Sequence, residues 1–377
     1  MGITIKEANT KKELKAFVTF NIDLYRDCPY HVPGLIADEM MTLNKEKNPA
    51  FEFCEAKYFL AYKGNKIVGR IAGIVNHKSN EVWKQQHARF GFVDFIDDEE
   101  VVGKLFEAAE SWAKSKGMTA MHGPLGFTDL DHEGLLIEGF DKISTMSTTY
   151  SYPYYSGHIE QLGYGKDQDW NEMIVRVPHE IPEKHARIAE IVKQKHGLKI
   201  VKFRKTKEIW PYAYKLFNLW NKAYAPLYAY APLSDRQIEY YIKMYIPMLR
   251  LDLISLVVRE ADDEVVGLGI CIPNLSKALQ KAKGHLFPFG IVHLLKALYS
   301  KKVKVADMMM IGVDPEYQNK GVNAIVLVDT IKELKKLGVE YCETNPELEI
   351  NEKVQSLWEH FDASKPIKKR RAYIKNI

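Results

Sequence analysis

Residues 313–323 read Val-Asp-Pro-Glu-Tyr-Gln-Asn-Lys-Gly-Val-Asn. The residues before them, 308–312, form an apolar run that is typical of a buried strand. The residues after them, 324–331, carry apolar side chains at helical spacing. A turn between a strand and a helix directs several backbone N–H groups toward the positive end of the helix. This arrangement favours the binding of a phosphate or pyrophosphate group.

The same stretch resembles the coenzyme A loop of the Gcn5-related N-acetyltransferase (GNAT) superfamily. The pattern of that loop is Val-x-Pro-x-Tyr-(Arg/Gln)-x-(Arg/Lys)-Gly-x-(Gly/Ala). Six positions of this chain match it, namely Val313, Pro315, Tyr317, Gln318, Lys320 and Gly321. The final small residue is replaced by Asn323, a residue type that tolerates a positive φ but whose side chain crowds a pyrophosphate. A Walker phosphate loop is excluded because Gly-Lys-Ser/Thr is absent. A plain strand-to-helix turn without a ligand is the alternative.

The composition predicts a globular protein with two domains. The chain has 377 residues, which favours two domains over one. Its net charge of +4 is spread along the chain, so no nucleic-acid partner is expected. The four cysteines lie far apart in sequence, so we expect free thiols in a reducing cytoplasm and no metal site. The most apolar stretch, 285–299, is too short to span a bilayer, and no membrane partner is expected.

Two distant segments share one order of elements. Residues 58–75 and residues 255–272 each read as a β-hairpin, with two β-rich runs around a polar turn. Downstream, each copy continues with a helix that ends in a glycine, Gly117 or Gly338, and then with a strand. The second copy is the longer one, which places an insertion at residues 275–299. The chain therefore reads as a repeat.

This order is that of the GNAT fold, as the resemblance implies. We therefore expect an α/β fold with mixed sheets and two tandem GNAT-like domains, residues 1–178 and residues 179–377. Only the C-terminal copy carries the coenzyme loop. The equivalent place in the N-terminal copy contains acidic residues instead, namely Asp94, Asp97, Asp98, Glu99 and Glu100. These charges would repel a pyrophosphate, so the N-terminal domain is predicted to lack a coenzyme site.

The resemblance implies that acetyl-CoA or another acyl-CoA is the co-substrate and that no metal takes part. It also implies which residues would hold the pantetheine arm and the pyrophosphate: Met310, Ile311, Val313, Gln318, Asn319, Lys320, Gly321, Val322 and Asn323. Asn351 is a further predicted contact to the pantetheine. It is also a good N-cap for the helix that the following residues predict.

Acyl transfer to an amine requires a base for the ammonium proton and an acid for the leaving thiolate. The predicted base is Glu343, because a carboxylate at the end of an apolar strand is partly desolvated, which raises its pKa. Capping of the next segment is the alternative role. Many GNAT enzymes place a tyrosine acid on the last helix, but the matching residue here is Trp358. Tyr373 on the final strand is the predicted substitute, and Tyr317 is a second candidate. Either is also a plausible packing residue.

The sequence thus predicts an N-acyltransferase, in the simplest case an N-acetyltransferase, that acts on a small-molecule amine or a peptide through its C-terminal domain. One alternative is a catalytically degenerate acyl-CoA-binding or sensor protein, which Asn323 and Trp358 favour. Another is an aminoacyl transferase with paired GNAT domains, which would need a basic groove that the charge balance does not predict. Residues 122–127 and 134–140 are similar to segments of a bacterial group of GNAT-like proteins, and this resemblance supplies no substrate.

Overall fold

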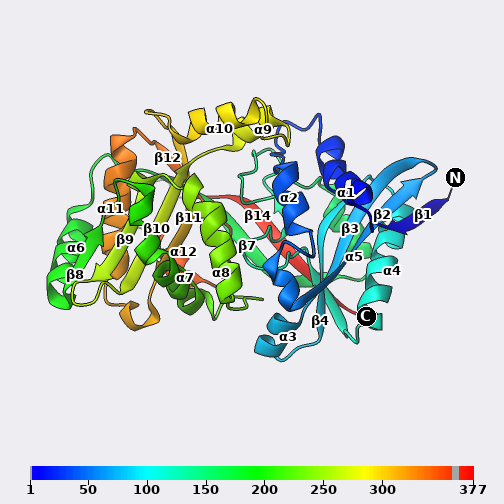
Figure 1. The fold of residues 1–377 in the computed structure, drawn as a ribbon, viewed down its shortest axis with the longest axis horizontal. Coiled ribbons are helices and arrows are strands. Elements are labelled where there is room, and N and C mark those ends of the chain that lie inside the picture. The colour runs from blue at the N-terminus through cyan, green and yellow to red at the C-terminus, as the bar shows by residue number, and fades with distance from the viewer. Residues whose placement is uncertain (1, 359–364) are drawn as a thin grey trace. The chain divides into compact units, whose positions relative to one another are not determined.

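The computed structural model describes residues 2–358 and 365–377 and has a mixed α/β architecture (Figure 1). The chain forms two compact units. Unit 1 comprises Met1–Asn171, Ser276–Leu294 and Ile367–Ile377, and unit 2 comprises Glu172–Leu275 and Leu295–Pro366. The two units therefore interleave along the chain. Among the described residues, no helix combines the length and the apolar character that crossing a bilayer requires.

Unit 1 is built on a sheet with the strand order β1-β2-β3-β4-β5-β14-β7. The strands are β1 (Ile3–Glu7), β2 (Cys54–Lys63), β3 (Lys66–Asn76), β4 (His87–Phe95), β5 (Ala120–Gly123), β14 (Lys365–Asn376) and the first part of β7 (Gly165–Arg176), and β6 (Leu135–Glu138) pairs with β14. The helices are α1 (Lys11–Leu24), α2 (Ile36–Thr42), α3 (His77–Trp83), α4 (Glu99–Ser115) and α5 (Tyr154–Gln161). Strands β4 and β5 run parallel, as the helix α4 between them requires.

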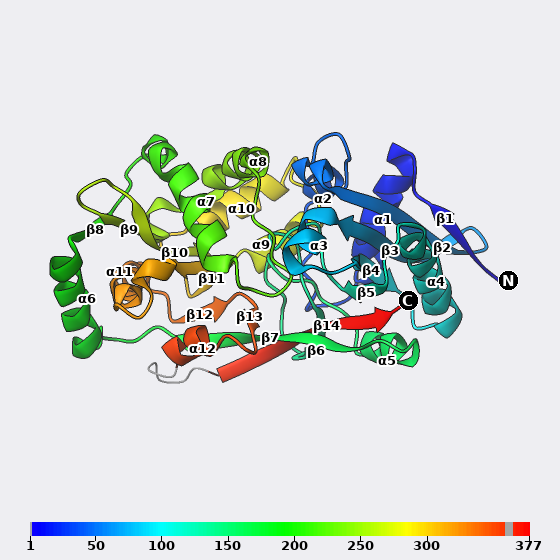
Figure 2. The same cartoon turned by 90° about the horizontal axis from the view of Figure 1, so that it is seen from below.

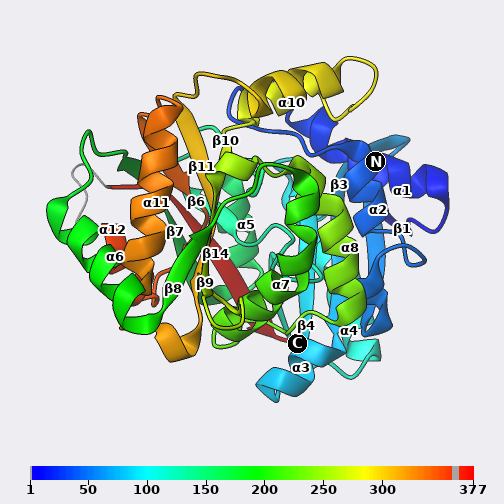
Figure 3. The ribbon, with the colours of Figure 1, turned by 60° about the vertical axis from the view of Figure 1, so that its left-hand side comes forward.

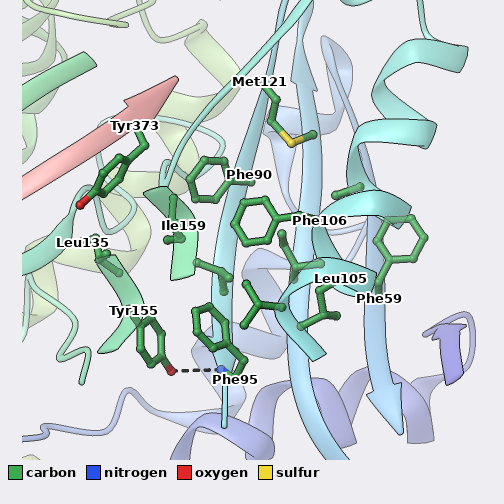
Figure 4. Packing of buried hydrophobic residues seen from close by; sticks show 14 of the residues in the cluster. Phe59, Phe90, Phe95, Leu105, Phe106, Met121, Leu135, Tyr155, Ile159 and Tyr373 are labelled. Atoms are coloured by element: carbon green, nitrogen blue, oxygen red, sulfur yellow. Dashed lines mark hydrogen bonds between the residues drawn. The ribbon is translucent and has the colours of Figure 1, made fainter. Parts of the chain in front are cut away.

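Local sequence explains how unit 1 begins and how its core is filled. Helix α1 starts at a capping box in which the side chain of Thr10 accepts from the N–H of Glu13. Helix α4 packs its apolar face on the sheet, where Phe106 meets Phe90 with ring centroids 5.0 Å apart. Figure 4 shows this aromatic core, in which the N–H of Phe95 donates to the hydroxyl of Tyr155 at 3.1 Å.

Unit 2 is built on a sheet with the order β7-β12-β11-β10-β9-β8, in which the last part of β7 takes part. Its other strands are β8 (Leu198–Val201), β9 (Ile254–Arg259), β10 (Val265–Pro273), β11 (Val305–Val313), β12 (Tyr341–Thr344) and the short β13 (Glu347–Leu348). The helices are α6 (Glu183–His196), α7 (Trp210–Tyr224), α8 (Asp235–Tyr245), α11 (Val322–Lys336) and α12 (Glu352–Trp358). Helices α6 and α11 pack side by side (Figure 3).

The repeat predicted from the sequence is confirmed. The first copy runs β1, α1, α2, β2, β3, β4, α4, β5 and β7, and the second runs β8, α7, α8, β9, β10, β11, α11, β12 and β14 in the same order. The predicted insertion is also present. It forms α9 (Ser276–Ala282) and α10 (Gly290–Leu298) between β10 and β11, where the first copy has only the short helix α3. One of the points at which the chain passes from unit 1 to unit 2 falls within α10.

The last strand of each copy pairs in the unit of the other copy. Strand β14, at the end of the second copy, pairs with β5 in unit 1, with Tyr373 opposite Gly123. The end of β7, from the first copy, pairs with β12 in unit 2, with Ile174 opposite Glu343. Figure 2 shows β14 beside β7. The two copies of the repeat therefore exchange their final strands between the compact units. The division at residue 178 stays a prediction about where the repeat in the sequence divides.

Candidate functional site

The predicted coenzyme loop connects β11 to α11 in unit 2. A short 3₁₀ turn, Pro315–Tyr317, follows the strand, and α11 begins at Val322. Gly321 has a φ of 82°, which glycine adopts without strain. Asn319 has a φ of 62°, so the asparagine in the left-handed region is Asn319, whereas Asn323 lies in the first turn of the helix. The match to the loop pattern thus corresponds to a tight turn at the start of a helix.

This turn offers a site for an anion. The first N–H groups of α11 have no partner within the helix, and the helix dipole makes this end positive. The side chain of Lys320 is exposed at the same turn, with its Nζ 5.1 Å from the centre of the Tyr317 ring. A Cβ atom on Gly321 would lie 3.0 Å from Val192 and 3.2 Å from Ile188 on α6. Gly321 is therefore required for packing as well as for its backbone conformation.

Strand β11 separates from β12 next to this turn. The two strands pair only from Val305 opposite Tyr341 to Met308 opposite Thr344. The pairing of β11 with β10 shifts between Met308 and Met310, so Met309 forms a bulge. From Met310 to Val313, the edge of β11 that faces away from β10 has no strand partner in the described part of the chain. We call the place where β11 and β12 separate, bordered by this free edge and the turn, the wedge.

Asn345 fixes the point at which the wedge opens. Its Nδ2 donates to the carbonyl oxygen of Met309 at 2.8 Å, and its N–H donates to the carbonyl oxygen of Met308 at 3.2 Å. The bulge is thus held by a side chain from the other strand. Asn351 lies at the start of α12, where its carbonyl oxygen accepts from the N–H groups of Val354 and Gln355. All ten predicted coenzyme-binding residues belong to unit 2, and so does Glu343.

Two buried carboxylates lie at the closed end of the wedge. Asp307 on β11 is directly opposite Glu343 on β12, and both are buried. Residues directly opposite each other place their side chains on the same face of a sheet. The Nδ2 of Asn274 donates to Asp307 at 2.7 Å. Because two carboxylates side by side in the interior repel each other when both are charged, the pair is suited to accept a proton.

The pair faces away from the coenzyme helix. Its sequence neighbours Ala306, Met308 and Cys342 belong to the apolar cluster that contains the α11 residues Leu327 and Ile331. Because side chains alternate along a strand, Asp307 and Glu343 lie on the opposite face. Helix α7 packs against β10 and β11, and Ala223 lies 3.8 Å from where a Cβ atom of Gly312 would be. The carboxylates of Asp307 and Glu343 therefore lie at the closed end of the wedge, on the face of the sheet against which α7 packs.

Sequence reasoning missed Asp307. The signal was available, because an aspartate interrupts the apolar run Ala306-Asp-Met308, and a charged residue inside a buried strand needs an explanation. The neighbouring thiols have no comparable role. Burial, with a further contribution from the charge of Asp307, raises the pKa of Cys271 to about 12. This thiol therefore stays protonated and unreactive at neutral pH.

Trp358, the residue at the expected position of a tyrosine acid, is a hydrogen-bond donor. It is buried, and its Nε1 donates to Oε1 of Glu347 at 2.8 Å. Burial raises the pKa of Glu347 to about 7, although the hydrogen bond from Trp358 acts in the opposite direction. Unit 2 thus contains a carboxyl group, that of Glu347, whose pKa is raised to about 7.

We expect Glu347 to make the stability depend on pH. Its folded-state pKa of about 7 lies above the ordinary value of 4.5, so the folded state holds the proton more tightly. The free energy of unfolding should therefore fall by up to about 3 kcal/mol as the pH rises through this window. Glu347→Gln should remove this fall, as measured by urea unfolding at about pH 5 and about pH 8. The exposed Glu340→Gln is the control, and an identical pH dependence in both variants would contradict the assignment.

Of the two tyrosines predicted as acids, Tyr373 lies in unit 1 and Tyr317 lies in the turn of unit 2. Tyr373 is buried in the core of unit 1, where its hydroxyl donates to Glu160 at 3.2 Å. Burial raises the pKa of Tyr373 well above its ordinary value, and the charge of Glu160 adds to this shift. The structure therefore places Tyr373 and Glu343 in different units and does not bring them together in one. The Tyr317 hydroxyl accepts from Arg259 at 3.3 Å, and its ring packs against the cluster that contains Val192.

At the equivalent place in unit 1, the chain after β5 lies very close to β4. The N–H of Leu125 donates to the carbonyl oxygen of Phe90 on β4 at 2.9 Å. The backbones approach so closely that a Cβ atom on Gly91 would lie 2.2 Å from the carbonyl oxygen of Leu125. A Cβ atom on Gly123 would lie 2.1 Å from the carbonyl oxygen of Phe90. Only glycine fits at these two positions.

The acidic stretch of unit 1 is arranged differently from the prediction. Asp98 caps α4, and its carboxylate accepts from the N–H groups of Glu100 and Val101 at 3.0 and 3.3 Å. The helix start that would bind a phosphate is therefore occupied by its own side chain. Asp94, by contrast, is buried and pairs with Arg70 at 2.7 Å, so it is not one of the charges at the helix start. Asp97 contacts His158 at 2.6 Å.

Comparison with known proteins identifies relatives of this chain and solved structures with a similar fold. Protein YghO of Escherichia coli (strain K12) is 30% identical over 380 residues, covering 97% of this chain and 94% of that protein. A bacterial ceramide synthase of Caulobacter vibrioides is 28% identical over 323 residues, covering 84% and 82%. The solved structure of a tandem GNAT protein from the clavulanic acid biosynthesis pathway matches 99% of this chain and 98% of its own, with 11% identity and a TM-score of 0.56. No protein-family model matches the chain.

Proposed function

We propose that this chain is an acyl-CoA-dependent N-acyltransferase whose reaction takes place in unit 2. The chain belongs to the same family as protein YghO and has a tandem GNAT fold. The observation that carries this proposal is the wedge between β11 and β12. It has a free strand edge at one side, the turn 318–323 at its mouth and the carboxylates Asp307 and Glu343 at its closed end.

The residues of the wedge have separable roles in the proposed reaction. The turn and Lys320 bind the pyrophosphate, and the free edge from Met310 to Val313 offers backbone groups to the pantetheine arm. Glu343, with Asp307 beside it, accepts a proton from the ammonium group of the acceptor. The amine nitrogen then bonds to the thioester carbon and the carbon–sulfur bond breaks. The nitrogen loses a second proton and the departing thiolate gains one, so the products are an amide and coenzyme A. Asn274 is a positioning residue for Asp307.

For the acceptor, we propose a long-chain amino alcohol, with a fatty acyl-CoA as donor. The support is the relative named bacterial ceramide synthase, since a ceramide is the amide of a fatty acid and such an amine. Aromatic side chains on α7, which packs against β10 and β11, and on α8, which packs against α7, are compatible with an apolar acceptor. Trp220 and Tyr224 on α7 have ring centroids 5.0 Å apart, and Tyr241 and Tyr245 on α8 have centroids 5.7 Å apart.

The test is an assay with a matrix of donors and acceptors. The purified protein is incubated with acetyl-CoA or palmitoyl-CoA and with a small amine, a peptide amine or sphinganine. Release of the coenzyme thiol and the mass of the amide product are measured. We expect amide formation that requires both substrates and is fastest with palmitoyl-CoA and sphinganine. An amide formed only from acetyl-CoA and a small amine would contradict the proposed acceptor. Acyl-CoA binding without any amide would favour a sensor role.

We expect one coenzyme per chain, bound in unit 2. Isothermal titration with acyl-CoA should give a stoichiometry near one, because Leu125 lies close against β4 at the equivalent place in unit 1 and the helix start there is capped by Asp98. At about 100 times its Kd, the coenzyme should add roughly 2.7 kcal/mol to the free energy of unfolding.

Lys320→Glu should remove most of this gain, since it replaces an attraction to the pyrophosphate with a repulsion. The control is Lys332→Glu, the same charge change at an exposed position further along α11. The packing of Gly321 against α6 makes Gly321→Glu a poorer test, because that variant would also lose stability. Two equivalent sites per chain, or an unchanged gain in Lys320→Glu, would contradict a single site at this turn.

A further inference from the structure

The insertion between β10 and β11 exposes a concentrated apolar surface. Large apolar side chains are exposed at five positions within residues 287–299: Phe287, Phe289, Val292, Leu295 and Tyr299. The two phenylalanines are 71% and 74% exposed, which are the largest values among the large apolar side chains of the described residues. We call these five residues the α10 surface. Figure 1 shows α9 and α10 in yellow.

The insertion is held in place, so its exposed side chains do not belong to a loose loop. The hydroxyl of Ser276 donates to the carbonyl oxygen of Ser144 at 2.8 Å, and the Nε2 of Gln280 donates to those of Pro29 and His31. The N–H of Ile36 donates to the carbonyl oxygen of Gly284 at 2.9 Å. The segment is therefore fixed to unit 1 by polar contacts on its inner side.

Helix α10 is apolar on two faces. Leu294 and Leu298, one turn apart, are buried and form the inner face. Val292 and Leu295 are three residues apart on α10, and Tyr299, directly after the helix, donates its N–H to the carbonyl oxygen of Leu295. The side chains of these three residues are exposed, and at 3.6 residues per turn they lie beside the buried stripe. A contiguous exposed apolar patch of this kind marks an interaction site.

The segment that carries the α10 surface is basic. Residues 276–304 contain seven lysines and no aspartate or glutamate: Lys277, Lys281, Lys283, Lys296, Lys301, Lys302 and Lys304. All seven are exposed. Lys296 lies on α10 itself, and Lys301 and Lys302 follow shortly after its end. The chain as a whole has a net charge of only +4, so this segment is more basic than the rest.

We propose that the α10 surface docks the protein on an anionic lipid bilayer. Apolar and aromatic side chains rimmed by lysines are the combination that lies in the interface of such a membrane, with the rings among the headgroups and the ammonium groups near the lipid phosphates. The sequence argued against a membrane because residues 285–299 are too short to span one. Lying on the surface needs no such length. The inference rests on this surface and not on the identity of the acceptor.

The test is vesicle co-sedimentation of the full chain. Vesicles of phosphatidylcholine alone are compared with vesicles that contain phosphatidylcholine and phosphatidylglycerol in equal parts. We expect binding to the anionic vesicles, weaker binding to the neutral ones, and loss of binding at about 1 M salt, where charges are screened within roughly 3 Å. Phe287→Ser/Phe289→Ser should lower the fraction bound by about tenfold or more. Lys301→Glu/Lys302→Glu should abolish the preference for anionic vesicles.

The control is Val82→Ser/Ile191→Ser, which removes two exposed apolar side chains elsewhere. All variants should keep the melting temperature of the parent, because the changed side chains are exposed. The proposal is overturned if the parent does not bind anionic vesicles, if it binds neutral vesicles equally well, or if Phe287→Ser/Phe289→Ser binds as well as the control. It is also overturned if light scattering shows a dimer that this variant dissolves while no vesicles are bound, since a second copy would then cover the surface.

Discussion

Glu343→Gln is expected to lower kcat by about 10²- to 10⁴-fold, which is the usual contribution of a positioned general base. The amide has almost the same shape as the carboxylate but does not accept the ammonium proton. The side chain is buried beside Asp307, so no bulk water replaces it at this position. Binding of acyl-CoA should stay unchanged, because the turn at 318–323 and the free edge of β11 are not altered. A thermal shift with acyl-CoA measures this binding.

Asp307 provides the second half of this test. If the two carboxylates act as one pair that shares a proton, Asp307→Asn should also lower kcat, and the double variant should be little worse than Glu343→Gln alone. The matched control is Glu340→Gln, an exposed glutamate just before β12. An activity in Glu343→Gln within a few-fold of the parent would contradict the role of Glu343 as base. Independent, multiplying effects of the two variants would contradict the pair.

The sequence predicted the parts of this site that depend on neighbours in the chain. The turn between β11 and α11 was recognised because its residue types follow one another over a short stretch, and the hairpins were recognised from their alternation and their turns. Asp307 was missed although its strand was predicted correctly. Asp307 matters because it lies opposite Glu343 on the neighbouring strand. The sequence does not show which residues of two parallel strands joined by a helix lie opposite each other, so this pair could not be predicted.

Long-range pairing explains the other differences. The exchange of β7 and β14 between the units could not be predicted from the sequence. The alternation of apolar and polar residues in each of these strands would fit either sheet. It is this exchange that places Tyr373 in the core of unit 1 and not in the unit of Glu343. The close approach of Leu125 to Phe90 is likewise a long-range contact, and in the sequence only the glycines at 91 and 123 hint at it.

Asp94 is the residue whose role changed most between sequence and structure. The sequence grouped it with the acids at the start of α4, but its carboxylate lies inside unit 1 and accepts hydrogen bonds from three side chains. Oδ2 accepts from Arg70 Nε at 2.7 Å and from Asn21 Nδ2 at 3.0 Å, and Oδ1 accepts from the Tyr155 hydroxyl at 3.3 Å. The side chain of Arg70 is only 4% exposed, and Glu39 is its second partner. The network therefore depends on the charge of Asp94.

Asp94→Ala is accordingly expected to lower the free energy of unfolding by about 3–5 kcal/mol, the usual cost of removing one partner from a buried ion pair. The loss comes mainly from Arg70, which stays buried with only part of its charge compensated. Asp97→Ala, three residues further on, removes an exposed carboxylate and should cost less than about 1 kcal/mol. Urea unfolding of both variants measures the difference, and equal costs would show that Asp94 is not a buried partner of Arg70.

A different variant, Asp98→Ala, separates the two explanations for the missing coenzyme site in unit 1. If repulsion by the acids at the start of α4 were the cause, Asp98→Ala would weaken that repulsion and increase the stoichiometry of acyl-CoA. If the close approach of Leu125 to β4 is the cause, the stoichiometry should stay near one in Asp98→Ala, although this variant frees the amides at the start of α4. A second bound coenzyme in Asp98→Ala would show that charge, and not the close approach of β4 to the chain after β5, keeps the first copy empty.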